Sequence, residues 1–192
     1  METAATTTPL ALPRRRWPWV VTLLGGIAVA AVIVLLLTRG DDEIGAVHGP
    51  ADNPFTVTRP SGWESLSPEQ LQALPRQPVA VLHETDGKGI VIINVNARTN
   101  ADLSKLSGQL EARLSKKIPD FKLVKSRPIT VKAGRALSLS YARTKKGTAT
   151  TLLAVPTSRG LYTLNAVVPA GQDNAARDAA SILSSFDLTS AG

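Results

Sequence analysis

The residues best suited to acid–base or metal chemistry in this 192-residue chain lie at 83–86, where His83 is followed by Glu84 and Asp86. A histidine beside two carboxylates could serve as a general base or as a metal ligand. A lone histidine near the end of a predicted strand is, however, an ordinary structural residue. The other histidine, His48, stands alone in a loop-like segment, whereas a metal site needs several converging ligands. We therefore predict no catalytic residue, no metal site and no cofactor here.

Other chemistry is excluded by what the chain lacks. It holds no cysteine, so it has no thiol nucleophile, no disulfide and no cysteine for lipid attachment. No Gly-x-Ser-x-Gly elbow, HExxH helix or phosphate-binding loop is found. None of these motifs therefore marks the chain as an enzyme.

A basic cluster near a loop tip is the candidate contact site. Arg143, Lys145 and Lys146 could meet an acidic partner or acidic lipid headgroups. The alternative is that these charges only keep a hairpin soluble. The net charge is +7, but aromatic residues make up only 4% of the chain, and single-stranded nucleic acid is bound by stacking on aromatic side chains. We expect no nucleic-acid partner.

One apolar stretch at residues 17–38 is long enough to cross a lipid bilayer. Residues 20–37 carry no charge. At about 1.5 Å per residue, 22 helical residues reach about 33 Å, slightly more than a hydrocarbon core of about 30 Å. Arg14, Arg15 and Arg16 precede this stretch, while Arg39 alone follows it, and Trp17 and Trp19 sit at headgroup level. By the positive-inside rule, we expect residues 1–16 on the cytoplasmic side. Their small, polar and proline-bearing composition predicts a short disordered tail.

A cleaved signal peptide is the alternative to a membrane anchor. Signal peptides have apolar cores of about 7–15 residues followed by a small-x-small cleavage site. This stretch is longer and runs directly into Leu37, Thr38 and Arg39, which match no such site. We therefore expect a single-pass protein of the cell membrane, with a linker at 39–54 and an extracytoplasmic domain at 55–188.

Alternating and helical patterns follow each other through that domain. Strands are predicted at 55–59, 79–84, 89–97, 121–130, 135–141, 150–155 and 161–168. Pro128 makes 121–130 either an edge strand or two short pieces. Ser67, Pro68 and Gln70 form a capping-box pattern for a short helix. Leucines at 103, 106, 110 and 114 predict a helix over 102–118, and 173–186 predicts a closing helix.

The order of these elements and four short strings resemble the PsbP/Mog-type fold. The strings are FTVTRPSGW at 55–63, GRALSLSY at 134–141, GLYTLNAVVP at 160–169 and ASILSSF at 180–186. The resemblance covers about residues 53–188. The chain also resembles actinobacterial LpqN-like envelope proteins, but those are lipoproteins, and here a membrane helix would take the place of the lipid.

The resemblance implies an α+β fold, an α/β/α sandwich whose mainly antiparallel sheet is covered by helices on both faces. It also implies a non-enzymatic module that binds other proteins, here as an accessory or assembly factor for an unknown cell-envelope protein. The alternative is a domain that binds a small ligand or lipid in a cavity between sheet and helix. The residues of these strings also have a structural explanation: Gly62, Gly134 and Gly160 suit turns, and Trp63, Tyr141, Tyr162 and Phe186 suit a core.

Overall fold

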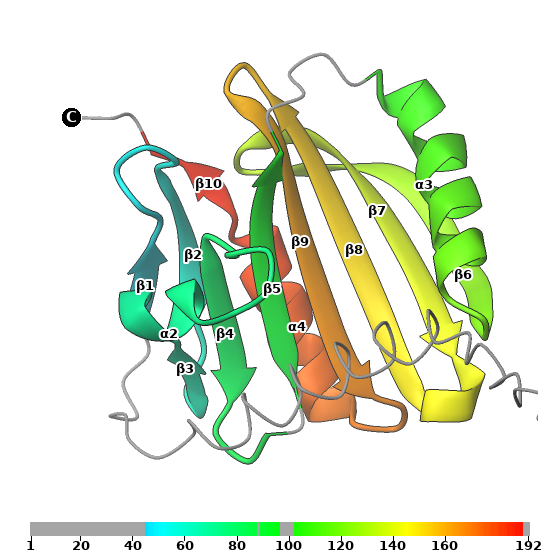
Figure 1. Cartoon of the computed structure of the whole chain (residues 1–192), viewed down its shortest axis with the longest axis horizontal. Helices are drawn as coiled ribbons and strands as arrows, with labels where there is room; N and C mark the ends of the chain where they lie inside the picture. Colours follow the sequence, from blue (N-terminus) through cyan, green and yellow to red (C-terminus); the bar gives the residue numbers. More distant parts are fainter. Residues whose placement is uncertain (1–44, 88, 97–101, 190–192) are drawn as a thin grey trace, which may run out of the picture.

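A seven-stranded antiparallel sheet forms the centre of the molecule (Figure 1). The computed structural model describes residues 45–87, 89–96 and 102–189. The strand order in the sheet is β3-β4-β5-β9-β8-β7-β6, and every neighbouring pair is antiparallel. The strands are β3 (Trp63–Ser65), β4 (Ala80–Glu84), β5 (Ile90–Asn96), β6 (Phe121–Val131), β7 (Gly134–Arg143), β8 (Thr148–Thr157) and β9 (Gly160–Pro169).

A second, three-stranded sheet packs beside the first. It has the order β1-β2-β10 and consists of β1 (Gly45–His48), β2 (Phe55–Arg59) and β10 (Asp187–Leu188). The sequence placed residues 45–48 in a linker spanning 39–54, and this is wrong for β1. The four residues GAVH have no strong strand pattern of their own, but they pair along β2, with Val47 opposite Val57. Residues 39–44 lie outside the described part.

Three α-helices complete the described part of the chain: α2 (Pro68–Gln72), α3 (Leu103–Lys117) and α4 (Asp173–Ser184). The predicted capping box is confirmed, because the Ser67 hydroxyl accepts from the Gln70 amide and the Gln70 side chain accepts from the Ser67 amide. A single 3-10 turn, η1 (Thr144–Lys146), joins β7 to β8 and ends at Gly147, which has a positive φ of 59°. A positive φ strains residues that carry a Cβ, so glycine fits this position.

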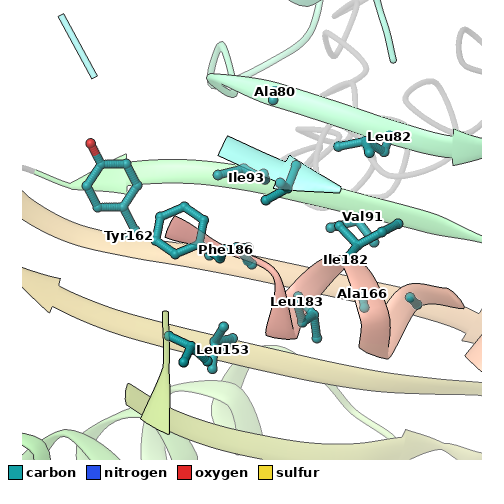
Figure 2. Close-up of a cluster of buried hydrophobic side chains, with 14 of the residues drawn as sticks. Ala80, Leu82, Val91, Ile93, Leu153, Tyr162, Ala166, Ile182, Leu183 and Phe186 are labelled. Carbon is teal, nitrogen blue, oxygen red and sulfur yellow. The ribbon is translucent and has the colours of Figure 1, made fainter. Parts of the chain in front are cut away.

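The main core lies between one face of the large sheet and a layer made of α4 and the small sheet. Figure 2 shows Ile182, Leu183 and Phe186 directed at side chains of the large sheet. Phe55 of β2 and Phe186 both pack on Tyr162 of β9, with ring centroids 6.2 and 5.3 Å from its own. The predicted closing helix is thereby confirmed, and it buries Ala175, Ala179, Ile182 and Leu183.

The opposite face of the large sheet is covered at its two sides. The leucine stripe of α3 packs on Leu137, Leu139 and Leu152 of β7 and β8. On the other side, Leu71 of α2 packs on a smaller cluster of Leu66, Leu74 and Val81. Helices therefore lie on both faces, and the predicted α+β class with mainly antiparallel strands is confirmed. The small sheet is an addition that the sequence did not indicate.

Strand β6 forms one edge of the large sheet, as its proline predicted. Pro128 lies within the strand opposite Leu137, and the register shifts between Leu123 and Lys125. Proline and a bulge both suit an edge, because neither supports regular pairing on two sides. The strand is continuous over 11 residues rather than broken into two pieces.

No helix within residues 45–87, 89–96 and 102–189 is long and apolar enough to cross a membrane. The predicted span at 17–38 and its flanking residues Arg14, Arg15, Arg16, Trp17 and Trp19 lie outside the described residues.

Candidate functional site

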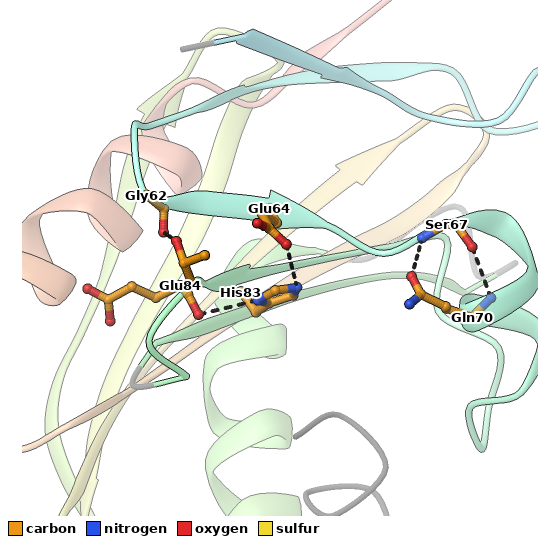
Figure 3. A network of polar contacts seen from close by, with 7 residues as sticks. Gly62, Glu64, Ser67, Gln70, His83 and Glu84 are labelled. Carbon is orange, nitrogen blue, oxygen red and sulfur yellow. Dashed lines mark hydrogen bonds and ion pairs between the residues drawn. The ribbon is translucent and has the colours of Figure 1, made fainter. Parts of the chain in front are cut away.

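The histidine singled out by the sequence has a different acidic partner from the two expected. His83 lies in β4 with its ring buried, at 3% exposure, and its Nε2 is 4.0 Å from Oε2 of Glu64 on β3 (Figure 3). Its Nδ1 is 3.3 Å from the Glu84 carbonyl oxygen. The Glu84 side chain lies on the opposite face of the sheet, because neighbouring residues in a strand alternate. Asp86 lies in the exposed turn after β4.

This buried pair is explained by sheet pairing. Glu64 stands directly opposite His83 in the register of β3 and β4, so the two side chains emerge on the same face. Sequence reasoning missed Glu64, since the pairing of 63–65 with 80–84 could not be inferred from either segment alone. Among the described residues, no group of three or more His, Cys, Asp or Glu is placed to hold a metal ion. The imidazole of His83 and the carboxylate of Glu64 make a cross-strand polar contact.

The predicted basic cluster divides into one anchored and two exposed residues. Nε of Arg143 donates to Oδ1 of Asp120 at 3.3 Å, and the Lys145 amide donates to Oδ2 at 3.0 Å. Burial of Asp120 opposes ionisation, but these hydrogen bonds and the charge of Arg143 outweigh it and lower the pKa of its carboxyl below the usual value. Arg143 thus fixes the loop that carries Lys145 and Lys146, both of which are exposed.

Three further lysines are exposed at the same end of the sheet. Lys116 and Lys117 end α3, and Lys122 lies in the first residues of β6, whose Phe121 pairs with Arg143. From the sequence, these two helix lysines complement the helix terminus and belong to a basic helix face that either is solvated or lies on a membrane surface. The register of β6 with β7 brings them beside the loop of Lys145 and Lys146. We call these five residues, Lys116, Lys117, Lys122, Lys145 and Lys146, the lysine end.

A hollow of about 570 Å³ opens between the small sheet and the edge of the large one. One side is formed by β1, including Ala46 and Val47. The other side is formed by Leu66, by Pro68 and Leu71 of α2, and by Val79 just before β4. We call this hollow the β1 groove. More of its lining is apolar than polar, and His48, Arg59 and Ser65 also line it. An edge strand borders it on each side, β1 in the small sheet and β3 in the large one.

The outer edge of β1, a strand that lines this groove, carries backbone hydrogen-bonding groups. The Gly49 amide donates to the Phe55 carbonyl at 2.8 Å, so the antiparallel alternation directs the amide of Val47 toward β2. The amides and carbonyls of Ala46 and His48 are directed away from β2, and no described strand pairs with that edge. His48 is exposed, as the sequence predicted, but it belongs to a strand and not to a loop.

The space between α4 and the large sheet is much smaller. A cavity of about 90 Å³ is lined there by small side chains such as Ala166, Ala176 and Ala180. Drug-sized ligands need about 300–1,000 Å³. A ligand site between this helix and the sheet, as the alternative function expected, would therefore need α4 to move.

Two solved structures share the fold of this chain. The crystal structure of LpqN from Mycobacterium tuberculosis, described as involved in cell envelope biogenesis, has a TM-score of 0.52 at 17% sequence identity and matches 77% of this chain and 91% of that one. A variant of the protein Mog1 has a TM-score of 0.54 at 11% identity and matches 76% of this chain and 96% of that one. No protein-family model matches the sequence, and no curated protein is significantly similar to it. These similarities support a PsbP/Mog-type domain, and at such identities they concern the fold alone.

Proposed function

We propose that this protein is a non-enzymatic, extracytoplasmic module, anchored in the cell membrane by residues 17–38, that binds an extended segment of another envelope protein in the β1 groove. The role would be that of an accessory or assembly factor. A part in the cell envelope is in keeping with the description of LpqN, whose fold the chain shares. The apolar stretch at 17–38 and its arginine flank support the anchor.

The observation that carries the proposal is the pairing edge of β1 inside an apolar groove. A strand edge offers amides and carbonyls in a regular row, and a peptide that adds to it gains main-chain hydrogen bonds. Here Ala46 and His48 supply such groups, while Leu66, Leu71 and Val79 offer apolar surface for alternate side chains of the bound segment. The segment recognised would therefore be extended, with small or apolar residues at every second position.

The test uses a proline that removes one outward amide. Ala46→Pro deletes the donor directed into the groove, and its N–H does not bond to β2, so the fold should be kept. Ala46→Ser is the matched control, because it changes the side chain and retains the donor. Full-length protein is cross-linked in membranes and purified, and its partner is identified and then expressed for direct binding. We expect Ala46→Pro to abolish binding of that partner and Ala46→Ser to preserve it. Equal binding by both variants would contradict recognition through β1.

A small-ligand or lipid-binding domain is the second candidate, and the volume of the β1 groove favours it. About 570 Å³ lies within the range of drug-sized ligands. A ligand that binds the folded state raises its stability by mass action. A thermal-shift panel of lipids and small metabolites therefore separates the two: a saturable shift for one compound, lost in Leu71→Glu, would favour a ligand-binding domain.

The absence of enzymatic activity is also part of the proposal. It is tested by incubating the purified full-length chain with panels of ester, phosphate and glycoside substrates. Turnover that disappears in His83→Gln or Glu64→Gln would show that the buried pair acts catalytically and would overturn this part of the proposal.

A further inference from the structure

We propose that the lysine end lies against anionic lipid headgroups of the membrane in which the chain is anchored, so that the domain is held in one orientation on the bilayer. The inference rests on the membrane anchor of the proposed function but not on the partner in the β1 groove. It turns a set of exposed lysines into a second binding surface, with an acidic bilayer as its ligand.

Basic residues are concentrated in one part of the domain. Residues 102–146, which form α3, β6, β7 and η1, contain 12 Lys and Arg against 3 Asp and Glu. One of those acids, Asp120, is already held by Arg143. Of the other carboxylates at this end, Glu84 and Asp86 belong to the end of β4 and the turn after it, across the sheet from α3, β6 and η1 (Figure 1). Asp173 begins α4, three residues after Ala170, whose amide donates to the Gly147 carbonyl beside η1 at 2.8 Å. The five lysines of the lysine end face solvent, and no ion pair joins any of them to a carboxylate within the described residues.

The start of β1 marks where the chain enters the described domain. Gly45, the first residue of β1, pairs with Arg59 at the end of β2, and Trp63 then pairs with Glu84 at the end of β4. At the same end of the large sheet lie Ile90 at the start of β5, Val167 near the end of β9, and the η1 loop between β7 and β8 (Figure 1). The chain therefore enters at the end of the molecule that carries the lysine end.

Few residues separate the predicted membrane span from β1. Because β1 begins at Gly45, only residues 39–44 remain as a tether, in place of the 16-residue linker expected from the sequence. Six residues reach at most about 20 Å when fully extended. So short a tether keeps the entry end near the headgroups, where basic residues are attracted to anionic lipid within a Debye length of about 8 Å.

The experiment measures the distance of each end of the domain from the lipid surface. The chain has no cysteine, so a single introduced cysteine can be labelled alone. Thr144→Cys places a fluorophore on η1 at the lysine end, and Ser158→Cys places one on the β8–β9 turn at the opposite end; both residues are exposed. Full-length protein is reconstituted in vesicles of phosphatidylcholine alone or mixed with phosphatidylglycerol, with a nitroxide quencher on the headgroups. We expect the probe at 144 to be quenched more than the probe at 158 in anionic vesicles only, and the difference to vanish at high salt.

Two matched double variants identify the charges responsible. Lys145→Gln with Lys146→Gln neutralises the two lysines of η1, just after the end of β7, while Lys132→Gln with Arg135→Gln neutralises two exposed basic residues around its start. Each lysine near an anionic surface strengthens docking about fivefold, so the first pair should lower the docking equilibrium about 25-fold. The second pair should leave it unchanged. An equal effect of both pairs, or equal quenching at 144 and 158, would overturn the proposal.

Failure of the anchor is separately visible. Protein that does not float with the vesicles on a density gradient would disprove the membrane anchor, whatever the quenching. Protein that floats while both probes stay unquenched would disprove docking of the lysine end alone. If the Lys145 and Lys146 variant instead loses an acidic protein partner and its quenching is unchanged, the surface binds protein rather than lipid, and the proposal is wrong.

Discussion

Two adjacent proline substitutions in β1 should have very different effects on stability. The amide of Val47 is directed at Val57 of β2, whose side chain is 1% exposed, so Val47→Pro leaves the Val57 carbonyl without its donor. An unsatisfied buried polar group costs about 1–3 kcal/mol, and loss of the half-buried Val47 side chain from the core adds about 1 kcal/mol. We expect Val47→Pro to lower the free energy of unfolding by about 2–4 kcal/mol. The amide of Ala46 is directed outward, and Ala46→Pro should cost less than about 1 kcal/mol.

The assay is urea unfolding of the full-length chain in detergent micelles, followed by pulse proteolysis. With a denaturant slope of about 2 kcal/mol per molar urea, Val47→Pro should lower the midpoint by about 1–2 M, and Ala46→Pro by less than about 0.5 M. Equal midpoints for the two variants would refute the assignment of β1 to the folded domain. They would return residues 45–48 to the linker and lengthen the tether on which the docking argument depends.

Two further predictions concern polar groups in the core. The hydroxyl of Tyr162 is buried without a hydrogen-bond partner, whereas that of Tyr141 is bonded to Thr150. In urea unfolding, Tyr162→Phe should therefore be neutral or stabilising, and Tyr141→Phe should cost about 1 kcal/mol. Destabilisation by Tyr162→Phe would show that its hydroxyl has a partner. The pKa of Asp120 is lowered in the folded state, so its contribution is complete above the unfolded pKa of about 3.9 and is lost as pH falls from there through the folded pKa. Asp120→Asn should flatten this part of the stability profile, and an unchanged acid dependence would mean that the contact with Arg143 contributes nothing.

Much of the fold could be predicted because its signals are local. The leucine stripe of α3 and the capping box at Ser67 are each encoded within a few residues, and both formed as expected. Pro128 likewise indicated an edge strand without reference to any neighbour. In each case the physical cause and the pattern lie in the same short segment.

What could not be predicted depends on pairing between distant segments. β1 is a strand because β2 offers it a partner, and its own four residues carry no alternation strong enough to show this. The contact of Glu64 with His83 follows from the register of β3 with β4, and the sequence pointed instead to the neighbouring Glu84 and Asp86. The lysine end is likewise assembled by the pairing of β6 with β7.

Amide hydrogen exchange in the complex reports on the pairing edge of β1 residue by residue. Full-length protein is compared alone and bound to its identified envelope partner, with exchange read at single residues of β1. We expect the amides of Ala46 and His48 to become protected on binding, while the amide of Val47, already directed at β2, changes little. Binding that leaves Ala46 and His48 exchanging as fast as in the free protein would contradict recognition through this edge.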